Sequence, residues 1–159
     1  MDNTKEIDNI DKRYHVFGML FLLSNKLEAL GNNFLGELTT KQWFFMLILM
    51  NFFKEPPTLS ELALEMGTSH QNAKQIAIKL EEKGFLVVKK DTKDKRVLRL
   101  TPTNKIEKYV KLRKDKDHFF IEKFFNVLTK EEVKNIYGSF TKLLDNIKVI
   151  ENEFLKRLI

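Results

Sequence analysis

The sequence of 159 residues contains no cysteine. Disulfide bonds, thiolate metal sites and cysteine nucleophiles are therefore excluded. Long hydrophobic segments are missing too, because no charge-free segment is longer than residues 42–53, whereas a membrane span needs ~20 residues. The apolar stretch at residues 16–23 follows an acidic leader and precedes no small-residue cleavage site, unlike a signal peptide. We therefore expect a cytoplasmic protein.

Patterns typical of enzymes are also missing. The three histidines, His15, His70 and His118, lie far apart in the sequence. There is no glycine-rich phosphate loop and no nucleophile elbow, and the chain offers few ligands for zinc. We therefore expect no enzyme, no catalytic residues, no bound metal and no cofactor.

Positive charge is concentrated in one part of the chain. There are 28 Lys and Arg against 22 Asp and Glu, a net charge of +6. Residues 83–116 contain 13 basic and 4 acidic residues, a net charge of +9. The rest of the chain, with 15 basic and 18 acidic residues, therefore carries a net charge of −3. Such segregation favours a surface that binds a polyanion over a merely solvated face.

Helix starts are marked by four segments that fit the capping box, in which a Thr and a Glu or Gln three residues later satisfy each other's backbone N–H groups. These segments begin at Thr39, Thr58, Thr68 and Thr129. A fifth start is predicted at Thr101-Pro102, with proline at the first helical position. The predicted helices cover about residues 11–30 (ended by Gly31), 41–53, 59–66, 69–83, 102–127 and 130–159, and the predicted strands cover 85–90 and 96–100.

This order predicts a mainly α-helical fold with one small β-hairpin. The hairpin tip, residues 91–95, lacks glycine, which indicates a longer loop and not a tight turn. The short helices at 59–66 and 69–83, joined at Gly67-Thr68, have the helix-turn-helix signature. A basic hairpin directly after such a pair is typical of a winged helix, in which one helix enters the DNA major groove and the wing reaches an adjacent groove or the backbone.

The predicted helix at 69–83 has two different faces. Its apolar residues recur at helical spacing and are predicted to pack on the preceding helix: Ala73, Ile76, Ala77 and Leu80. Its other face carries hydrogen-bond donors and acceptors suited to base edges and phosphates: Ser69, His70, Gln71, Asn72, Lys74, Gln75 and Lys79. For this helix alone a solvated face is the simpler interpretation, and the basic hairpin after it favours DNA binding.

The segment from Leu38-Thr39 to Leu100-Thr101 resembles the DNA-binding core of the MarR-type (multiple antibiotic resistance) regulators. The similar motifs are Leu38-Thr39-x-x-Gln42, Leu59-Ser60-Glu61-Leu62-Ala63, Leu80-Glu81-Glu82-Lys83-Gly84-Phe85-Leu86, Asp94-Lys95-Arg96 and Leu100-Thr101. The resemblance implies one protomer of residues 1–159 with a winged helix-turn-helix at 38–101. It also implies that the helices at 11–31 and 102–159 form a dimerisation region.

The same resemblance assigns roles within the DNA-binding core. Residues 69–83 become the recognition helix, and Arg96 becomes the wing arginine that enters the minor groove. Asp94 is similar to the family aspartate that positions this arginine through an ion pair. Further predicted DNA-binding residues of the wing are Lys89, Lys90, Lys93 and Lys95.

The helices at the two ends of the chain carry more apolar surface than one helical layer can cover. In the last helix these residues are Val133, Ile136, Tyr137, Phe140, Leu143, Leu144, Ile147, Ile150 and Phe154, and elsewhere Phe17, Phe21, Leu22, Phe120 and Phe124. They predict a homodimer whose recognition helices lie ~34 Å apart on a pseudopalindromic operator. The resemblance further implies a small-molecule effector, with Tyr14, His15 and Trp43 as candidate lining residues, although ordinary packing is the simpler explanation of these aromatics.

These observations predict a sequence-specific, double-stranded-DNA-binding transcriptional regulator, a homodimeric repressor released by a small-molecule effector. Two alternatives remain open. A winged helix can serve as a protein-interaction module, although such a module needs no basic wing, and this wing carries six basic residues: Lys89, Lys90, Lys93, Lys95, Arg96 and Arg99. A non-specific architectural DNA binder would share the basic wing but show little preference among sequences.

Overall fold

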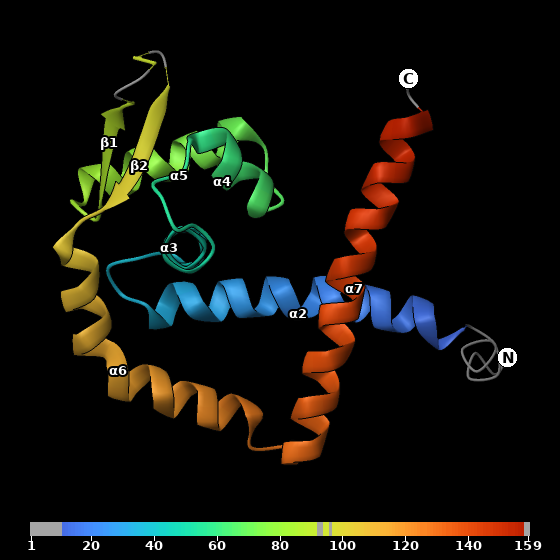
Figure 1. Ribbon diagram of the computed structural model, residues 1–159. Coiled ribbons are helices and arrows are strands. Elements are labelled where there is room, and N and C mark those ends of the chain that lie inside the picture. Colours follow the sequence, from blue (N-terminus) through green and yellow to red (C-terminus); the bar gives the residue numbers. More distant parts are fainter. Residues whose placement is uncertain (1–10, 92–93, 96, 158–159) are drawn as a thin grey trace, which may run out of the picture. The chain divides into compact units, whose positions relative to one another are not determined.

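The computed structural model describes residues 11–91, 94–95 and 97–157 and, within them, six helices and one two-stranded antiparallel sheet (Figure 1). The elements in chain order are α2 (Lys12–Phe34), α3 (Thr40–Asn51), α4 (Leu59–Glu65), α5 (His70–Glu82), β1 (Leu86–Lys90), β2 (Leu98–Pro102), α6 (Asn104–Phe125) and α7 (Lys130–Arg157). The predicted mainly helical fold with a β-hairpin wing is confirmed. The chain divides into two compact units, one ending at Lys108 and the other beginning at Tyr109.

Three of the four predicted capping boxes are present. Thr39 pairs with Gln42 and Thr58 with Glu61 at the starts of α3 and α4, and α7 begins in the same way at Thr129. Gly67 and Gly84 follow α4 and α5 with φ of +63° and +75°, the left-handed conformation that ends helices and suits glycine. The local signals therefore locate most helix ends to within one or two residues.

The predicted capping box at Thr68 is wrong. Ser69 is the N-cap of α5, and its side chain accepts a hydrogen bond from the Asn72 backbone N–H at 3.2 Å. The Thr68 hydroxyl instead accepts a hydrogen bond from the Asn72 side-chain amide at 2.8 Å. Both residues can cap a helix, and the extended backbone of Ser69 decides which one does.

The predicted helix start at Thr101-Pro102 is also wrong, because both residues belong to β2 and pair with Val87 and Leu86. Proline is tolerated there because it is the last residue of its strand. The hydroxyl of Thr103 then accepts a hydrogen bond from Lys105 N at 3.2 Å, just before α6 begins. The strand predicted at 96–100 therefore lies at Leu98–Pro102.

Gly31 does not end α2, which continues to Phe34. It is the only buried residue of this helix, and a Cβ there would collide with the Thr40 hydroxyl. That hydroxyl donates a hydrogen bond to the Glu28 carbonyl at 2.9 Å. The glycine therefore allows a close approach between α2 and the start of α3, and this contact has more influence than the local stop signal.

The core of the first unit lies among α3, α4, α5 and the hairpin. The fully buried large side chains come from all of these elements and from the loops beside them: Phe45, Phe85, Leu38, Met46, Leu62, Leu80, Leu86 and Leu100. The four predicted apolar residues of α5 are all buried, as are Leu62 and Ala63 of α4. The helix-turn-helix and its wing are therefore held by one shared core.

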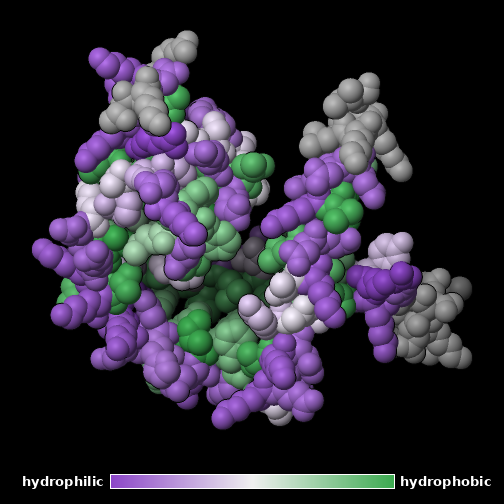
Figure 2. All heavy atoms as spheres, viewed as in Figure 1, coloured by the Kyte–Doolittle hydropathy of each residue, from purple (hydrophilic) through white to green (hydrophobic). Residues whose placement is uncertain are grey.

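The second unit buries little. Among the described side chains, none between residues 110 and 154 is buried. Figure 2 shows hydrophobic side chains among hydrophilic ones on the surface of α7. On α6, the rings of Phe124 and Phe125 pack edge to face with centroids 4.8 Å apart. None of the described helices combines the length and hydrophobicity of a membrane-spanning helix.

Candidate nucleic-acid interface

The polar residues predicted on α5 are all exposed, on the side of the helix that faces away from the core. Two of them help to start the helix, because Ser69 is its N-cap and the Asn72 amide donates to Thr68. The others, which stand along the outer surface, are His70, Gln71, Lys74, Gln75 and Lys79. This part of α5 can therefore present amide, imidazole and ammonium groups to a ligand.

The wing places further basic residues at the surface. Lys89 and Lys90 on β1 and Lys95 in the connection are exposed. Asp94 is half-buried; its backbone N–H donates to the Asp91 carboxylate at 3.1 Å, and its carbonyl accepts from Val97 N at 2.9 Å. The predicted wing residues Lys93 and Arg96, and with them the predicted Asp94–Arg96 ion pair, lie outside the described residues.

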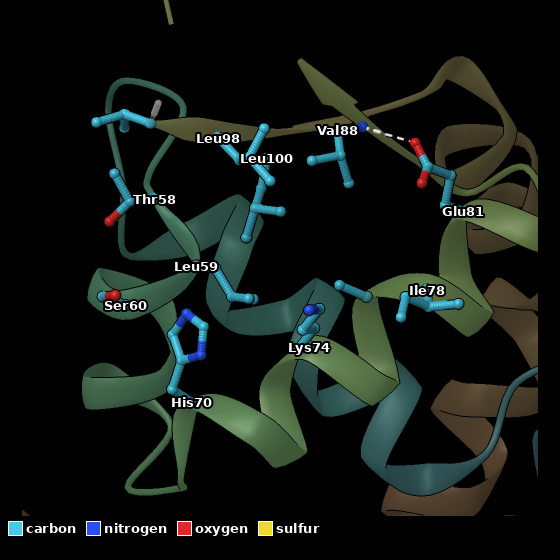
Figure 3. A pocket seen from close by; sticks show the side chains of 12 residues that line it. Thr58, Leu59, Ser60, His70, Lys74, Ile78, Glu81, Val88, Leu98 and Leu100 are labelled. Atoms are coloured by element: carbon cyan, nitrogen blue, oxygen red, sulfur yellow. Dashed lines mark hydrogen bonds between the residues drawn. The ribbon is translucent and has the colours of Figure 1, made fainter. Parts of the chain in front are cut away.

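A groove of about 530 Å³ separates α5 from the wing. In Figure 3, Lys74 and Ile78 of α5 lie across from Val88, Leu98 and Leu100 of the hairpin. Its remaining lining comes from the start of α4 and the rest of α5, with Val97 at the wing: Thr58, Leu59, Ser60, His70, Ala77 and Glu81. Helix and wing are therefore adjacent walls of one surface depression.

The wing is tied to α5 by a hydrogen bond across this groove. The backbone N–H of Val88 donates to a carboxylate oxygen of Glu81 at 2.9 Å, drawn as the dashed line in Figure 3. A carboxylate that accepts a backbone N–H in this way is held in place. The C-terminal end of α5 therefore positions β1.

Arg99 anchors the other strand of the wing. Its Nε donates to Asp91 Oδ2 at 2.7 Å, and its Nη1 donates to the Pro56 carbonyl at 3.2 Å and lies 3.5 Å from Glu61 Oε2. The hydrogen bond to Asp91 holds the pKa of Arg99 above its ordinary value. Beside it, Leu100 N donates to the Pro57 carbonyl at 2.9 Å. Sequence reasoning counted Arg99 simply as wing charge, and no motif pointed to this anchoring role.

Other basic residues of the segment 83–116 also have internal partners. Lys83 Nζ donates to the Glu37 carbonyl at 2.6 Å and to Gln42 Oε1 at 2.8 Å. Lys105 Nζ donates to the Lys83 carbonyl at 2.9 Å, pairs with the Glu37 carboxylate and lies 4.4 Å from the centroid of the Phe85 ring. The local excess of positive charge therefore overstates the basic surface, because part of it stabilises the lobe.

The candidate effector residues are not brought together by the first unit. Tyr14 and His15 lie in the first turn of α2, whereas Trp43 lies near the start of α3. The two helices meet at Gly31 and Thr40, and 17 residues of helix between Tyr14 and Gly31 span about 25 Å. A site that included all three would need additional surface from elsewhere.

A helix-turn-helix whose second helix presents a polar face beside a basic β-hairpin defines the winged-helix class of DNA-binding domains. Residues 38–98 match the sequence profile of the MarR family of winged-helix transcriptional regulators. Regulators of this family are not enzymes. A search among curated proteins gives no match.

Solved structures agree on the fold. The crystal structure of MarR has a TM-score of 0.74 and 20% identity, covering 96% of this chain and 98% of that one. The organohalide-sensing regulator RdhR bound to 2,4-dichlorophenol has a TM-score of 0.74 and 17% identity, covering 89% of this chain and 84% of that one. MepR of S. aureus in complex with DNA has a TM-score of 0.70 and 16% identity, covering 87% of this chain and 99% of that one.

Proposed function

We propose that the chain binds an operator in the cytoplasm with sequence specificity, as a homodimer, and acts as a repressor that a small-molecule effector releases from DNA. The observation that carries the proposal is the position of the polar face of α5 beside the basic wing across one groove. A helix in the major groove and a ribbon at the adjacent backbone need this arrangement. The structural likeness to MepR, which was crystallised with DNA, supports it.

Individual roles follow from side-chain chemistry. Gln71 and Gln75 have the paired donor and acceptor that read adenine, and Lys74 reaches guanine or phosphate. His70, Lys79 and the wing lysines are suited to the DNA backbone, which fixes orientation without reading sequence. Ser69 and Asn72 contribute by fixing the helix start and the backbone N–H groups there. Arg96, positioned by Asp94, and Lys93 complete the proposed contacts on the strength of the family resemblance.

The homodimer is supported by α7, 28 residues long, whose apolar residues stay at the surface of the single chain. Phe140, Leu144 and Ile147 are exposed by 42, 62 and 48%. A helix with an apolar stripe normally buries that stripe, and a second copy offers the same stripe in return. We therefore assign residues 11–31 and 102–159 to dimerisation and residues 38–101 to DNA binding.

Fluorescence anisotropy on two labelled duplexes at near-physiological salt tests the DNA-binding part. One duplex carries the DNA upstream of the chain's own gene, and the other is a scramble of the same composition. We expect a preference of about 10³-fold or more, as specific regulators have. Weak, equal and steeply salt-dependent binding would favour an architectural binder, and no binding to either duplex would favour an interaction module.

The effector part is tested with 2,4-dichlorophenol, because the similar regulator RdhR binds it. Trp43 is the only tryptophan in the sequence and is partly exposed, so its fluorescence reports on a ligand nearby. We expect quenching at the same concentrations that release the labelled operator. Release without quenching would mean that Trp43 does not line the site. The absence of both quenching and release across a panel of small phenols would contradict a phenolic effector.

A further inference from the structure

The outer face of α5 contains one apolar side chain that the core does not need. The residues of α5 that pack inward are Ala73, Ile76, Ala77 and Leu80, each at most 7% exposed. Ile78, in contrast, is 40% exposed. The apolar stripe that holds the helix in the lobe is therefore complete without Ile78.

Ile78 continues a line of two glutamines along the helix. Residues 71, 75 and 78 are spaced by four and then three positions, so they follow one another on one face of an α-helix. Gln71 and Gln75 are exposed, like Ile78. Figure 3 places Ile78 on α5 at the groove, across from Val88 of the wing. Ile78 therefore extends the proposed base-reading face towards the wing.

Two acidic residues limit this face on its C-terminal side. The Glu81 carboxylate is occupied by the Val88 N–H, and Glu82 is exposed at the last position of the helix. Carboxylates are repelled by the DNA backbone, because each phosphate carries a negative charge. Ile78 is therefore the last residue of this line that can approach the bases favourably.

The chemistry of the line fits A·T base pairs. Glutamine binds adenine through its N6 and N7 atoms, and the thymine C5-methyl is the apolar group that the major groove presents. Isoleucine has no hydrogen-bonding group, so it distinguishes bases only through such apolar contact. An adenine read by glutamine and a thymine methyl covered by isoleucine are the complementary features of A·T pairs.

We propose that Ile78 is a specificity-determining residue that packs on a thymine methyl group in each half-site. The inference rests on the proposed function and adds a base preference to it. It makes the line of Gln71, Gln75 and Ile78 a reader of consecutive A·T pairs. Lys74 and Lys79 on either side then hold the helix to the backbone.

The test begins with selection of duplexes from a random pool by the wild-type protein. Each thymine of the selected half-site is then replaced in turn by deoxyuracil, which lacks only the methyl group. We expect one thymine whose replacement weakens wild-type binding about three- to fivefold, the effect of one buried methyl. Ile78→Ala should weaken binding to the normal duplex by a similar or larger factor and show no penalty for deoxyuracil at that position.

Two further variants separate this role from general effects. Ile78→Val keeps a branched side chain and should retain part of the deoxyuracil penalty. Leu64→Ala removes an apolar residue of α4 that is 79% exposed and should leave both affinity and penalty unchanged. An Ile78→Ala protein that keeps the full penalty at every thymine would overturn the inference. Failure of the wild-type protein to enrich any sequence would instead overturn the proposed function on which it rests.

Discussion

The winged-helix lobe and the outer helices α2 and α7 differ in how far their apolar side chains are buried. The lobe has its own core, with Phe45, Leu62 and Leu80 fully buried. In α2 only Gly31 is buried, and none of the described side chains of α7 is. Yet both outer helices are rich in large apolar residues. The lobe is therefore stabilised within one chain, whereas the outer helices carry surface suited to a second chain.

The two regions also differ in how their polar groups are used. In the lobe, long-range contacts fix the parts proposed to face DNA: Arg99 joins the wing to Pro56 and Glu61, and Glu81 joins it to α5. In α7, by contrast, the Thr141 hydroxyl donates to the Tyr137 carbonyl only four residues away. In the proposed function, positioning of the DNA-binding groups is therefore a property of the lobe, and spacing between two lobes is a property of the outer helices.

The largest effect is expected from disrupting the apolar face of α7. The double substitution Phe140→Asp with Ile147→Asp places two charges seven residues apart on that face. We expect sedimentation as an 18.8 kDa monomer and a loss of operator affinity of about 10²- to 10⁴-fold, because two linked half-site contacts become one. Amide hydrogen exchange should still show protection in α3, α4 and α5.

A matched control lies one residue away. Thr141 is exposed and next to Phe140, about 100° from it around the axis of α7, so Thr141→Asp should keep the dimer and the affinity. A double variant that sediments like the wild-type protein would refute the assignment of α7 to dimerisation.

The second prediction separates folding from assembly. Leu80→Ala empties a fully buried position of the lobe and should lower the free energy of unfolding by about 2–5 kcal/mol, with the dimer dissociation constant unchanged. Leu144→Ala, in an exposed position of α7, should raise the dimer dissociation constant about tenfold or more and lower stability only through mass action. Urea unfolding and sedimentation on dilution measure the two quantities. Similar changes in both quantities for both variants would remove the distinction between the regions.

Much of the fold was predictable because its signals are local. The capping boxes at Thr39, Thr58 and Thr129 and the apolar stripe of α5 each depend on residues within a few positions of one another. Errors arose where pairing across the chain decides. Pro102 belongs to β2 because it lies opposite Leu86, and Gly31 stays helical because Thr40 packs against it. Neither partner can be read from the neighbouring sequence.

The candidate site was predictable in its residue types but not in its internal links. The exposed face of α5 follows from helical periodicity alone. The partners of the basic residues cannot be predicted from periodicity. Lys83 contacts Glu37 across 46 sequence positions, and Lys105 contacts the same residue across 68. A charge count cannot separate such internally paired lysines from exposed ones that are free to bind a polyanion. The role proposed for Ile78 was not predicted for a related reason, since a pattern of polar residues does not include an apolar residue on the proposed binding face.

The third prediction sharpens the role of Arg99 as an anchor. If Arg99 positions the wing through Asp91, then Arg99→Gln and Asp91→Asn should each weaken operator binding, by about tenfold or less. The double variant should be no weaker than Arg99→Gln alone, because that substitution already removes the Arg99–Asp91 interaction along with the contacts to Pro56 and Glu61. Anisotropy titrations on one duplex measure all four proteins. A gain of affinity for Asp91→Asn would contradict the anchor, because it would mean that the carboxylate only repels DNA.

The smallest expected effect concerns the carboxylate at the start of α4. Hydrogen bonding with Thr58, first from its backbone N–H, holds the pKa of Glu61 below its ordinary value. A lowered folded-state pKa means that this stabilisation is complete above the unfolded-state pKa and is lost in acid, as the pH falls through the lower folded-state value. Because Glu61 is more than half exposed, solvent screening limits the effect to about half a kcal/mol. NMR titration of the Glu61 carboxyl group should give a midpoint below the ordinary value for a glutamate side chain. Glu61→Gln retains a cap without the titrating group and should remove this part of the acid dependence of unfolding, so equal acid dependence in both proteins would contradict the assignment.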